Sequence, residues 1–353
     1  MPINEGFVDE SGNAVKQSNG YCDDPTNAST RRNKQQVFGF SSETFLVTVF
    51  VLVVIILFFA LITFVVLFTG MSRIDDNLAD IKHDIDDKNE EEDFIRGVDY
   101  KYDSQAFWFH DFPQCSGIQQ SPIRIFSQTV EIANSTSTIV YEPPVTSIKL
   151  QNTGHSYKLS PYPAPSFTSG TLGDANFTLA QMHFHWGAEH WIDDDHYSSE
   201  LHMVTHLSSH SDLGTALGAN DVAVFGLFLE ECAACNNPNF ERLVTGVTKI
   251  VEAGSTVTLS GSDVMSVWTQ GFVQTIFDNH AKEWYHYNGS LTTPPCNEGI
   301  NWNVFRSFEP MPSSVLNKLK TLKEKWGDYM ENNYRVPQPQ NTRIVIRFKD
   351  SSP

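Results

Sequence analysis

The longest apolar stretch of the chain lies close to its N-terminus. No charged residue occurs between Thr44 and Ser72, and Phe45–Phe68 consists almost entirely of Val, Leu, Ile and Phe. In a helix that rises about 1.5 Å per residue, these 24 residues reach roughly 36 Å, more than the ~30 Å of a hydrocarbon core. A cleavable signal peptide is disfavoured, since 44 mostly polar residues precede the run and no small-residue cleavage pattern follows it. The pattern predicts a transmembrane signal-anchor helix over residues 44–70.

The basic residues that flank this run indicate its orientation. Arg31, Arg32 and Lys34 precede the run, whereas the far side opens with Arg73 followed by acids. Basic residues near the ends of a span mark its cytoplasmic side. We therefore expect a single-pass type II protein, whose later residues lie outside the cell or in a lumen. Residues 1–43 are rich in Ser, Asn, Gly and Gln and are predicted to form a disordered cytoplasmic tail.

A weaker apolar repeat follows the predicted span at intervals of three and four residues. The surrounding positions are strongly acidic, with ten acids and two bases over residues 75–93, so residues 71–96 are predicted to form an acidic helical stalk. A solvated spacer helix and a weakly self-associating stalk both fit, because two heptads are short for a coiled coil. The seam of the possible weak homodimer consists of Met71, Ile74, Leu78, Ile81 and Ile85.

Beyond the stalk, the pattern changes to short β-type runs separated by clusters of Pro, Gly, Asn and Ser. We expect one mainly β domain of the α+β class over residues 97–350. The clearest strand runs are Ser147–Leu150, Val222–Leu229, Thr256–Leu259 and Arg343–Phe348, and the clearest helical period covers Pro312–Asp328.

The composition is that of a folded, acidic protein. The 353 residues include 42 Asp and Glu against 24 Lys and Arg, for a formal charge of −18. This acid excess argues against nucleic acid as the partner. With 40% hydrophobic residues the chain can bury a substantial core, which excludes a wholly disordered protein.

Three of the twelve histidines are spaced as metal ligands. His183 and His185 would project from the same face of one strand, about 7 Å apart. His202 follows seventeen residues later, a gap that suits a return on a neighbouring antiparallel strand. Three neutral imidazoles suit Zn²⁺ and leave a fourth position open for water, as in catalytic zinc sites. Gln181 and Glu200 each precede a candidate ligand by two residues, where their oxygens could hold the second ring nitrogen.

Five motifs in register give the β domain a specific resemblance. They are Gln-Ser-Pro at 120–122, Gly-His at 154–155, Gln-x-His-x-His-Trp-Gly at 181–187, Glu-Leu-His at 200–202 and Gly-Ser-Leu-Thr-Thr-Pro-Pro at 289–295. Over about Val98–Phe348 the chain resembles the α-class carbonic anhydrases. The resemblance implies a large central, twisted, mostly antiparallel β-sheet, with zinc at the base of a conical cleft. It also implies reversible hydration of carbon dioxide to bicarbonate and a proton.

The resemblance implies a role for each matching residue around the zinc ligands His183, His185 and His202. Thr292 would accept a hydrogen bond from the zinc-bound hydroxide that attacks carbon dioxide, and would donate its own proton to Glu189. Thr293 would be a neighbouring cleft hydroxyl, His155 the proton shuttle and Tyr100 a part of the solvent network. The apolar wall beside carbon dioxide would consist of Val204, Val224, Leu291 and Trp302.

Some positions depart from the family pattern. The link from Trp186 to Glu189 is shorter than in cytosolic members. Thr153 and Lys158 stand where members often carry asparagines that line the water network. Because Lys158 would bring a cation near His155, proton transfer, and not zinc binding, is the step that these changes put in question.

The cysteines and glycan acceptors suit an oxidising compartment outside the cytoplasm. The resemblance implies a disulfide between Cys115 and Cys296. Cys232 and Cys235 could form a short-range disulfide or remain two free thiols, and Cys22 is left unpaired in the tail. Sequons for N-glycosylation stand at Asn134, Asn176 and Asn288.

Three functions fit these observations. The first is a membrane-anchored, zinc-dependent carbonic anhydrase that acts on extracellular or lumenal carbon dioxide and bicarbonate. The second is a catalytically silent relative that serves as an adhesion or ligand-binding ectodomain, which loss of a zinc ligand would favour. The third is a zinc esterase, which sequence alone does not separate from the first because the same hydroxide attacks activated esters. The presence of all three histidines, with Glu189 and Thr292, favours the carbonic anhydrase.

Overall fold

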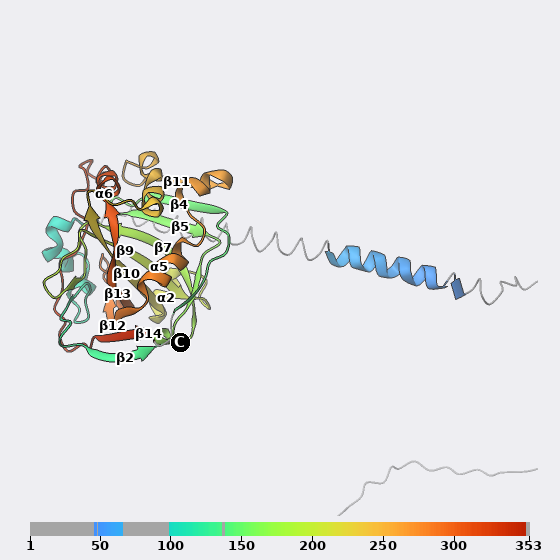
Figure 1. The fold of residues 1–353 in the computed structure, drawn as a ribbon, viewed down its shortest axis with the longest axis horizontal. Coiled ribbons are helices and arrows are strands. Elements are labelled where there is room, and N and C mark those ends of the chain that lie inside the picture. Colours follow the sequence, from blue (N-terminus) through green and yellow to red (C-terminus); the bar gives the residue numbers. More distant parts are fainter. Residues whose placement is uncertain (1–45, 48, 66–98, 136–137, 351–353) are drawn as a thin grey trace, which may run out of the picture. The chain divides into compact units, whose positions relative to one another are not determined.

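The computed structural model describes residues 46–47, 49–65, 99–135 and 138–350 (Figure 1). The chain divides into two compact units, Met1–Asn77 and Leu78–Pro353. In the first unit, residues 46–47 and 49–65 are helical and have exposed side chains. Within the described ranges, no helix is both long and apolar enough to cross a membrane. The predicted tail (1–43), stalk (71–96) and stalk seam, and both ends of the predicted span, lie outside the described residues.

The second unit is built mainly of β-strands connected by short helices. The described strands are β1 (Arg124–Ile125), β2 (Glu131–Ser135), β3 (Ile139–Tyr141), β4 (Ser147–Asn152), β5 (Tyr157–Tyr162), β6 (Ser166–Thr168), β7 (Asn176–His185), β8 (Trp191–Ile192), β9 (Ser199–Leu207), β10 (Val222–Cys232), β11 (Thr256–Ser260), β12 (Glu283–Ser290), β13 (Glu298–Pro312) and β14 (Ile346–Asp350). The α-helices are α2 (Leu213–Ala219), α3 (Pro238–Leu243), α4 (Val264–Val267), α5 (Phe272–His280) and α6 (Ser313–Leu319). The 3₁₀ helices are η1 (Tyr102–His110), η2 (Pro113–Ser116), η3 (Gly170–Leu172), η4 (Thr245–Lys249) and η5 (Gly261–Asp263).

One 12-stranded sheet organises this unit. Its strand order is β11-β4-β5-β7-β9-β10-β13-β12-β14-β2, and β3 joins through β6, which pairs with β7. Figure 1 shows β2 and β14 at one edge and β11 and β4 at the other. Within this sheet, the β10–β13 and β14–β2 pairs are parallel and the other described pairs are antiparallel. The predicted mainly β class and mostly antiparallel pairing are therefore confirmed, in a mixed sheet.

The central strands are buried on both faces because the sheet has a hydrophobic core on each side. In β10, Phe225 and Leu227 belong to the larger core, whereas Val224 and Phe228 belong to the smaller one. Alternate side chains of a strand point to opposite faces, so the nearly continuous apolar run of β10 fills both cores. Helix α5 adds its buried face to the larger core.

Most of the predicted elements occur near their expected positions. The runs expected around residues 147, 222 and 256 are β4, β10 and β11, while β14 starts only at Ile346. Before β14, the side chain of Arg343 bonds the carbonyls of Pro339 and Gln340, which holds a turn. The predicted helix Pro312–Asp328 was too long, because α6 ends at Leu319 and the chain then turns so that Leu322 is fully buried.

Two disulfides lie in this unit. Cys115 and Cys296 are bonded with their Cα atoms 4.9 Å apart, and Cys232 is bonded to Cys235. The three sequon asparagines, Asn134, Asn176 and Asn288, have exposed side chains.

Candidate metal centre

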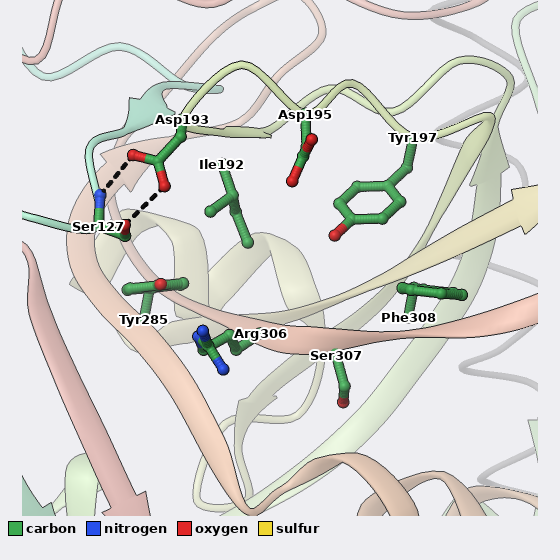
Figure 2. A pocket seen from close by; sticks show the side chains of 9 residues that line it. All are labelled: Ser127, Ile192, Asp193, Asp195, Tyr197, Tyr285, Arg306, Ser307 and Phe308. Atoms are coloured by element: carbon green, nitrogen blue, oxygen red, sulfur yellow. Dashed lines mark hydrogen bonds between the residues drawn. The ribbon is translucent and has the colours of Figure 1, made fainter.

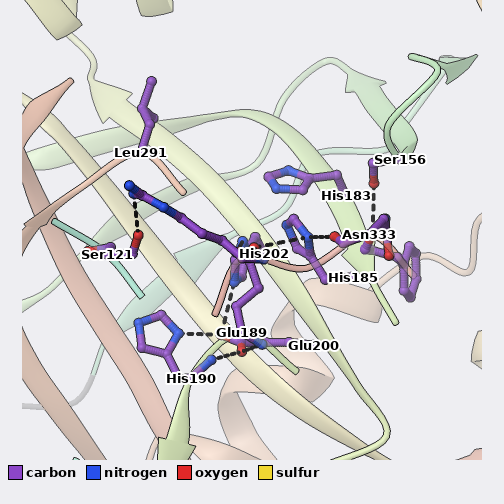
Figure 3. A network of polar contacts seen from close by, with 12 residues as sticks. Ser121, Ser156, His183, His185, Glu189, His190, Glu200, His202, Leu291 and Asn333 are labelled. Atoms are coloured by element: carbon purple, nitrogen blue, oxygen red, sulfur yellow. Dashed lines mark hydrogen bonds and ion pairs between the residues drawn. The ribbon is translucent and has the colours of Figure 1, made fainter. Parts of the chain in front are cut away.

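Neighbouring strands bring the three candidate ligands together. β7 and β9 are antiparallel, and His183 lies directly opposite His202 in their register. The ring centroids are 4.9 Å apart for His183 and His185, 5.1 Å for His183 and His202, and 4.6 Å for His185 and His202. One nitrogen from each ring lies within 4.8 Å of the other two (Figure 3).

Strand alternation explains why the rings share a face. Phe184 in β7, together with Leu201 and Met203 in β9, points into the larger core. The three histidines alternate with these residues and therefore project from the opposite face of the sheet. Val204 on that face belongs to the smaller core.

Each ring is held by a hydrogen bond from its second nitrogen. His183 Nδ1 donates to Gln181 Oε1 at 2.9 Å, and His202 Nε2 donates to Glu200 Oε1 at 2.9 Å. His185 Nδ1 donates to the carbonyl oxygen of Asn333 at 2.6 Å. These bonds leave Nε2 of His183, Nε2 of His185 and Nδ1 of His202 as the free nitrogens. Such contacts fix the tautomer and orientation of metal-binding imidazoles.

The chemistry of these free nitrogens fits a zinc ion. His185 Nε2 is buried and has no hydrogen-bond partner among the described residues. Burial is the main cause that lowers the pKa of His183 and of His185, although Glu189 opposes the effect on His185. Neutral imidazole is the form that binds metal, and three such nitrogens match a catalytic zinc centre.

Glu200 connects the candidate ligand His202 to a second buried histidine, His190. Its Oε1 also accepts from His190 Nδ1 at 2.8 Å, and its Oε2 accepts the backbone N–H groups of Glu189 and His190 (Figure 3). Burial acts to raise the pKa of Glu200, but the charges and hydrogen bonds of His190 and His202 hold it well below its usual range. Gly226 faces this carboxylate, because a Cβ there would lie 2.7 Å from Glu200 Oε1.

A second group of side chains lies close enough to hold a metal ion, but hydrogen bonds already occupy both nitrogen atoms of one of its histidines, His190. His190, Glu200 and His202 also lie close enough to share an ion. However, His190 Nδ1 is bonded to Glu200 and its Nε2 lies 2.7 Å from the hydroxyl of Tyr287. The His183–His185–His202 group, with its free nitrogens, is therefore the better metal centre.

Glu189 lies beside the metal centre in a fully buried position. Its Oε1 lies 3.5 Å from His185 Nδ1 and accepts the backbone N–H of Arg335 at 2.8 Å. Its Oε2 has no hydrogen-bond partner in the part of the chain that the structure describes. The hydrogen bond expected from Thr292 is thus not formed among the described residues, although Thr292 is buried. This oxygen lies 3.9 Å from His202 Nδ1, too far for a hydrogen bond, so it is an available acceptor.

The residues expected to form the apolar wall gather in the smaller core. Val204, Val224 and Trp302 are buried there, and Leu291 packs against them. The Trp302 ring lies 4.8 Å from the His202 ring, and its N–H donates to the carbonyl oxygen of Ser290. With that N–H satisfied, the wall next to the metal centre is apolar.

His155 lies in a cluster of aromatic and charged side chains. Its ring stacks on Tyr100 at 3.8 Å, and its Nε2 lies 2.7 Å from Asp99 Oδ1. Burial is the main cause that raises the pKa of Tyr100, while a hydrogen bond with Thr293 opposes it. The structure therefore brings together His155, Tyr100 and Thr293.

The two departures noted near His155 have local roles in the fold. Thr153 Oγ1 accepts the backbone N–H groups of His155 and Ser156 and so closes a turn. Lys158 lies opposite His183 in the β5–β7 register. His155 Nε2 pairs with the anion Asp99, which no sequence motif marked although it directly precedes Tyr100.

Two further residues that support the site were also missed. The Asn333 side chain bonds Trp186 N–H and the carbonyls of Phe184 and His155. The Arg335 side chain donates to Gln120 and to the Ser121 and Cys115 carbonyls, and burial lowers its pKa to about 10, opposed by Glu189. No motif or periodicity marks either residue.

A separate cavity of about 350 Å³ opens elsewhere on the domain (Figure 2). Figure 2 shows Asp193 turned to Ser127, whose N–H and hydroxyl bond the carboxylate at 2.9 and 2.6 Å. Arg306 pairs with Glu283 at 3.3 Å. None of the lining residues belongs to the histidine centre or its hydrogen-bond partners.

Comparison with known proteins identifies the family. A family model described as eukaryotic-type carbonic anhydrase matches residues 103–349. Carbonic anhydrase 6 of Homo sapiens is 30% identical over 258 residues, which cover 68% of this chain and 79% of that protein. Carbonic anhydrase 12 of Homo sapiens is 27% identical over 273 residues, with 71% and 73% covered, and carbonic anhydrase 7 of Homo sapiens is 29% identical over 259 residues, with 69% and 93% covered. Because the matched region contains the whole histidine centre, the chain belongs to the eukaryotic-type carbonic anhydrases, the α-class family that its motifs resemble.

Proposed function

We propose that the β domain is a zinc-dependent carbonic anhydrase that reversibly hydrates carbon dioxide to bicarbonate and a proton. The observation that carries this proposal is the histidine centre. Each of the three imidazoles offers a nitrogen within 4.8 Å of the other two, while a hydrogen bond holds one nitrogen of each ring. His183, His185 and His202 would hold the ion. When bound, zinc would supply a water whose pKa is lowered to about 7, a value known from carbonic anhydrases themselves.

The chain's own residues would divide the remaining work. Val204, Val224, Leu291 and Trp302 would hold the apolar substrate and exclude water beside His202, consistent with their packing in one core. The unpartnered Glu189 Oε2 would accept the Thr292 hydroxyl, which leaves the threonine oxygen to orient the attacking group. This arrangement requires the threonine to donate to the carboxylate, so the hydroxyl can then act toward substrate only as an acceptor.

Proton release would be a separate task at the edge of the site. His155 would receive the proton and pass it to buffer, since histidine titrates near physiological pH. Tyr100 stacks on this ring and bonds Thr293, which supports the proposed solvent network.

We further propose that the chain is a type II single-pass membrane protein, with its enzyme domain outside the cell or in a lumen. The apolar run Phe45–Phe68 and the basic residues before it support this orientation. Two disulfides in the β domain suit an oxidising compartment. The exposed Asn134, Asn176 and Asn288 would then be available for glycosylation.

One experiment tests the enzymatic proposal. The full-length chain, purified in detergent, should bind one zinc ion and hydrate carbon dioxide in a stopped-flow assay, and a sulfonamide should inhibit it. Zinc binding without hydration would contradict the enzyme and favour a silent ligand-binding domain.

A further inference from the structure

A partly buried carboxylate contacts the ring of His155 from one side. Asp99 Oδ1 lies 2.7 Å from His155 Nε2, and the same oxygen accepts the backbone N–H of Tyr100 at 2.8 Å. The side chains of Asp99 and His155 are only 14% and 16% exposed. Solvent therefore competes little for this contact.

An aromatic ring fixes His155 from a second side. The Tyr100 ring is nearly parallel to the imidazole, at 12° and 3.8 Å, and the Tyr102 ring meets the imidazole edge-on at 6.3 Å. Burial raises the pKa of both tyrosines, so they are neutral near pH 7. The imidazole thus lies between neutral aromatic rings and one carboxylate.

The surrounding charges keep Asp99 ionised. Burial of Asp99 acts to raise its pKa, but the hydrogen bond and charge of His155, the Tyr100 N–H and the Lys325 charge together lower it. Lys325 Nζ lies 3.5 Å from Asp99 Oδ2. Glu324 also interacts with His155, and burial raises the pKa of Glu324 while His155 and Lys101 oppose that rise.

We propose that Asp99 is a positioning residue for proton transfer, holding the His155 imidazole in one orientation against Tyr100. This inference rests on the proposed carbonic anhydrase function. Because Nε2–H is donated to Asp99, Nδ1 is the ring nitrogen that accepts the incoming proton. The resulting imidazolium keeps its Nε2–H bond to Asp99. It then gives the proton on Nδ1 to buffer, which restores the neutral ring.

Two physical effects of Asp99 can be separated by substitution. The hydrogen bond restricts the ring, which removes the entropy cost of orienting it in each cycle. The negative charge also strengthens this hydrogen bond, because a bond to a carboxylate is stronger than one to a neutral oxygen. Asp99→Asn keeps an oxygen that can accept from Nε2–H but removes the charge, whereas Asp99→Ala removes both.

Steady-state hydration kinetics of the full-length chain in dilute buffer test the orientation effect. We expect Asp99→Ala to lower kcat roughly three- to tenfold, to leave kcat/KM unchanged, and to recover when imidazole is added. Asp99→Asn should retain most of kcat. Asp111→Asn, an exposed position in the same N-terminal segment, is the matched control and should behave as wild type.

The nitrogen-15 NMR spectrum of the His155 ring tests the hydrogen bond to Asp99 without any need for activity. In wild type the ring-nitrogen shifts should report one tautomer, with the proton on Nε2. Asp99→Ala should give a mixture of the two tautomers, while Asp111→Asn should leave the spectrum unchanged.

The outcomes separate this inference from the proposed function. If His155→Ala lowers kcat but Asp99→Ala does not, or if the His155 tautomer is the same in Asp99→Ala as in wild type, the role of Asp99 is wrong although the shuttle stands. If His155→Ala leaves kcat unchanged in every buffer, the proposed shuttle itself fails, and the role of Asp99 fails with it.

Discussion

His183 and His202 face each other directly across the antiparallel β7–β9 pair, with their rings 5.1 Å apart and nearly perpendicular at 89°. A hydrogen bond holds His183 through Nδ1 and His202 through Nε2. Among the described residues, the nitrogen without a hydrogen bond is therefore Nε2 in His183 and Nδ1 in His202. The pair of strands thus forms two sides of the metal centre, and His185 adds the third from the end of β7.

Removal of one ligand should empty the centre. In His202→Ala, two imidazoles remain, which cannot hold the ion in closed geometry, so zinc and nearly all hydration activity should be lost. Metal analysis of the purified variant measures this directly. His210→Ala, which changes a histidine in a loop outside the centre, is the control and should keep its zinc. A stoichiometric zinc content in His202→Ala would refute the ligand assignment.

The partners of the ligands should tune zinc binding and not abolish it. Gln181→Ala removes one contact to His183, and we expect zinc affinity or activity to fall roughly 10–100-fold. Glu200→Gln should produce a similar loss together with a lower melting temperature. The reason is that Glu200 also accepts two backbone N–H groups and His190, all of them buried. Competition with a zinc chelator and thermal melts separate the two effects, and unchanged affinity in both variants would disprove the pairing.

Proton transfer should be separable from hydration. His155→Ala should lower steady-state turnover in dilute buffer and recover as imidazole is added, while the exchange of carbon dioxide and bicarbonate at chemical equilibrium is spared. Oxygen-18 exchange measures both steps in one experiment. A rate that stays the same at every buffer concentration would show that protons leave by another route.

The long-range disulfide should stabilise the loop that carries Thr292. Cys115 and Cys296 are 181 residues apart in sequence, and chain-entropy arguments assign such a closure on the order of 4–5 kcal/mol as an upper value. We expect Cys115→Ser with Cys296→Ser to melt clearly lower and yet to keep zinc and measurable activity at low temperature.

The second disulfide supplies the control for that experiment. Cys232→Ser with Cys235→Ser opens a bridge between residues only three apart, so the melting temperature should change far less. Equal losses in the two double variants would show that loop closure is not the source of the stability. Free thiols at Cys115 and Cys296 in the full-length protein purified from cells would contradict the bond itself.

The predicted stalk should associate weakly and in a salt-dependent way. Ile74, Leu78, Ile81 and Ile85 favour pairing, whereas the acid excess over residues 75–93 opposes it through repulsion that salt screens. Sedimentation of a chain beginning at residue 71 should show more dimer at high salt. Monomer at both low and high salt would identify the stalk as a plain spacer.

The sequence by itself determined the features that depend on local geometry. The alternation of side chains along a strand placed His183 and His185 on one face, and Gln181 on the same face beside them. Apolar runs likewise marked β4, β10 and β11. These features are readable because the relation between residue i and residue i+2 in a strand does not depend on the rest of the fold.

Tertiary structure alone decided which distant groups complete the site. The partner of His185 is the carbonyl of Asn333, 148 residues away, and the partner of His155 is Asp99, 56 residues away. Asn333 lies in an irregular segment between α6 and β14, which has no repeating backbone geometry and so no sequence period to mark it. Such contacts arise because the packing of the whole sheet sets the path of that segment, and buried polar groups must find partners wherever that path brings them.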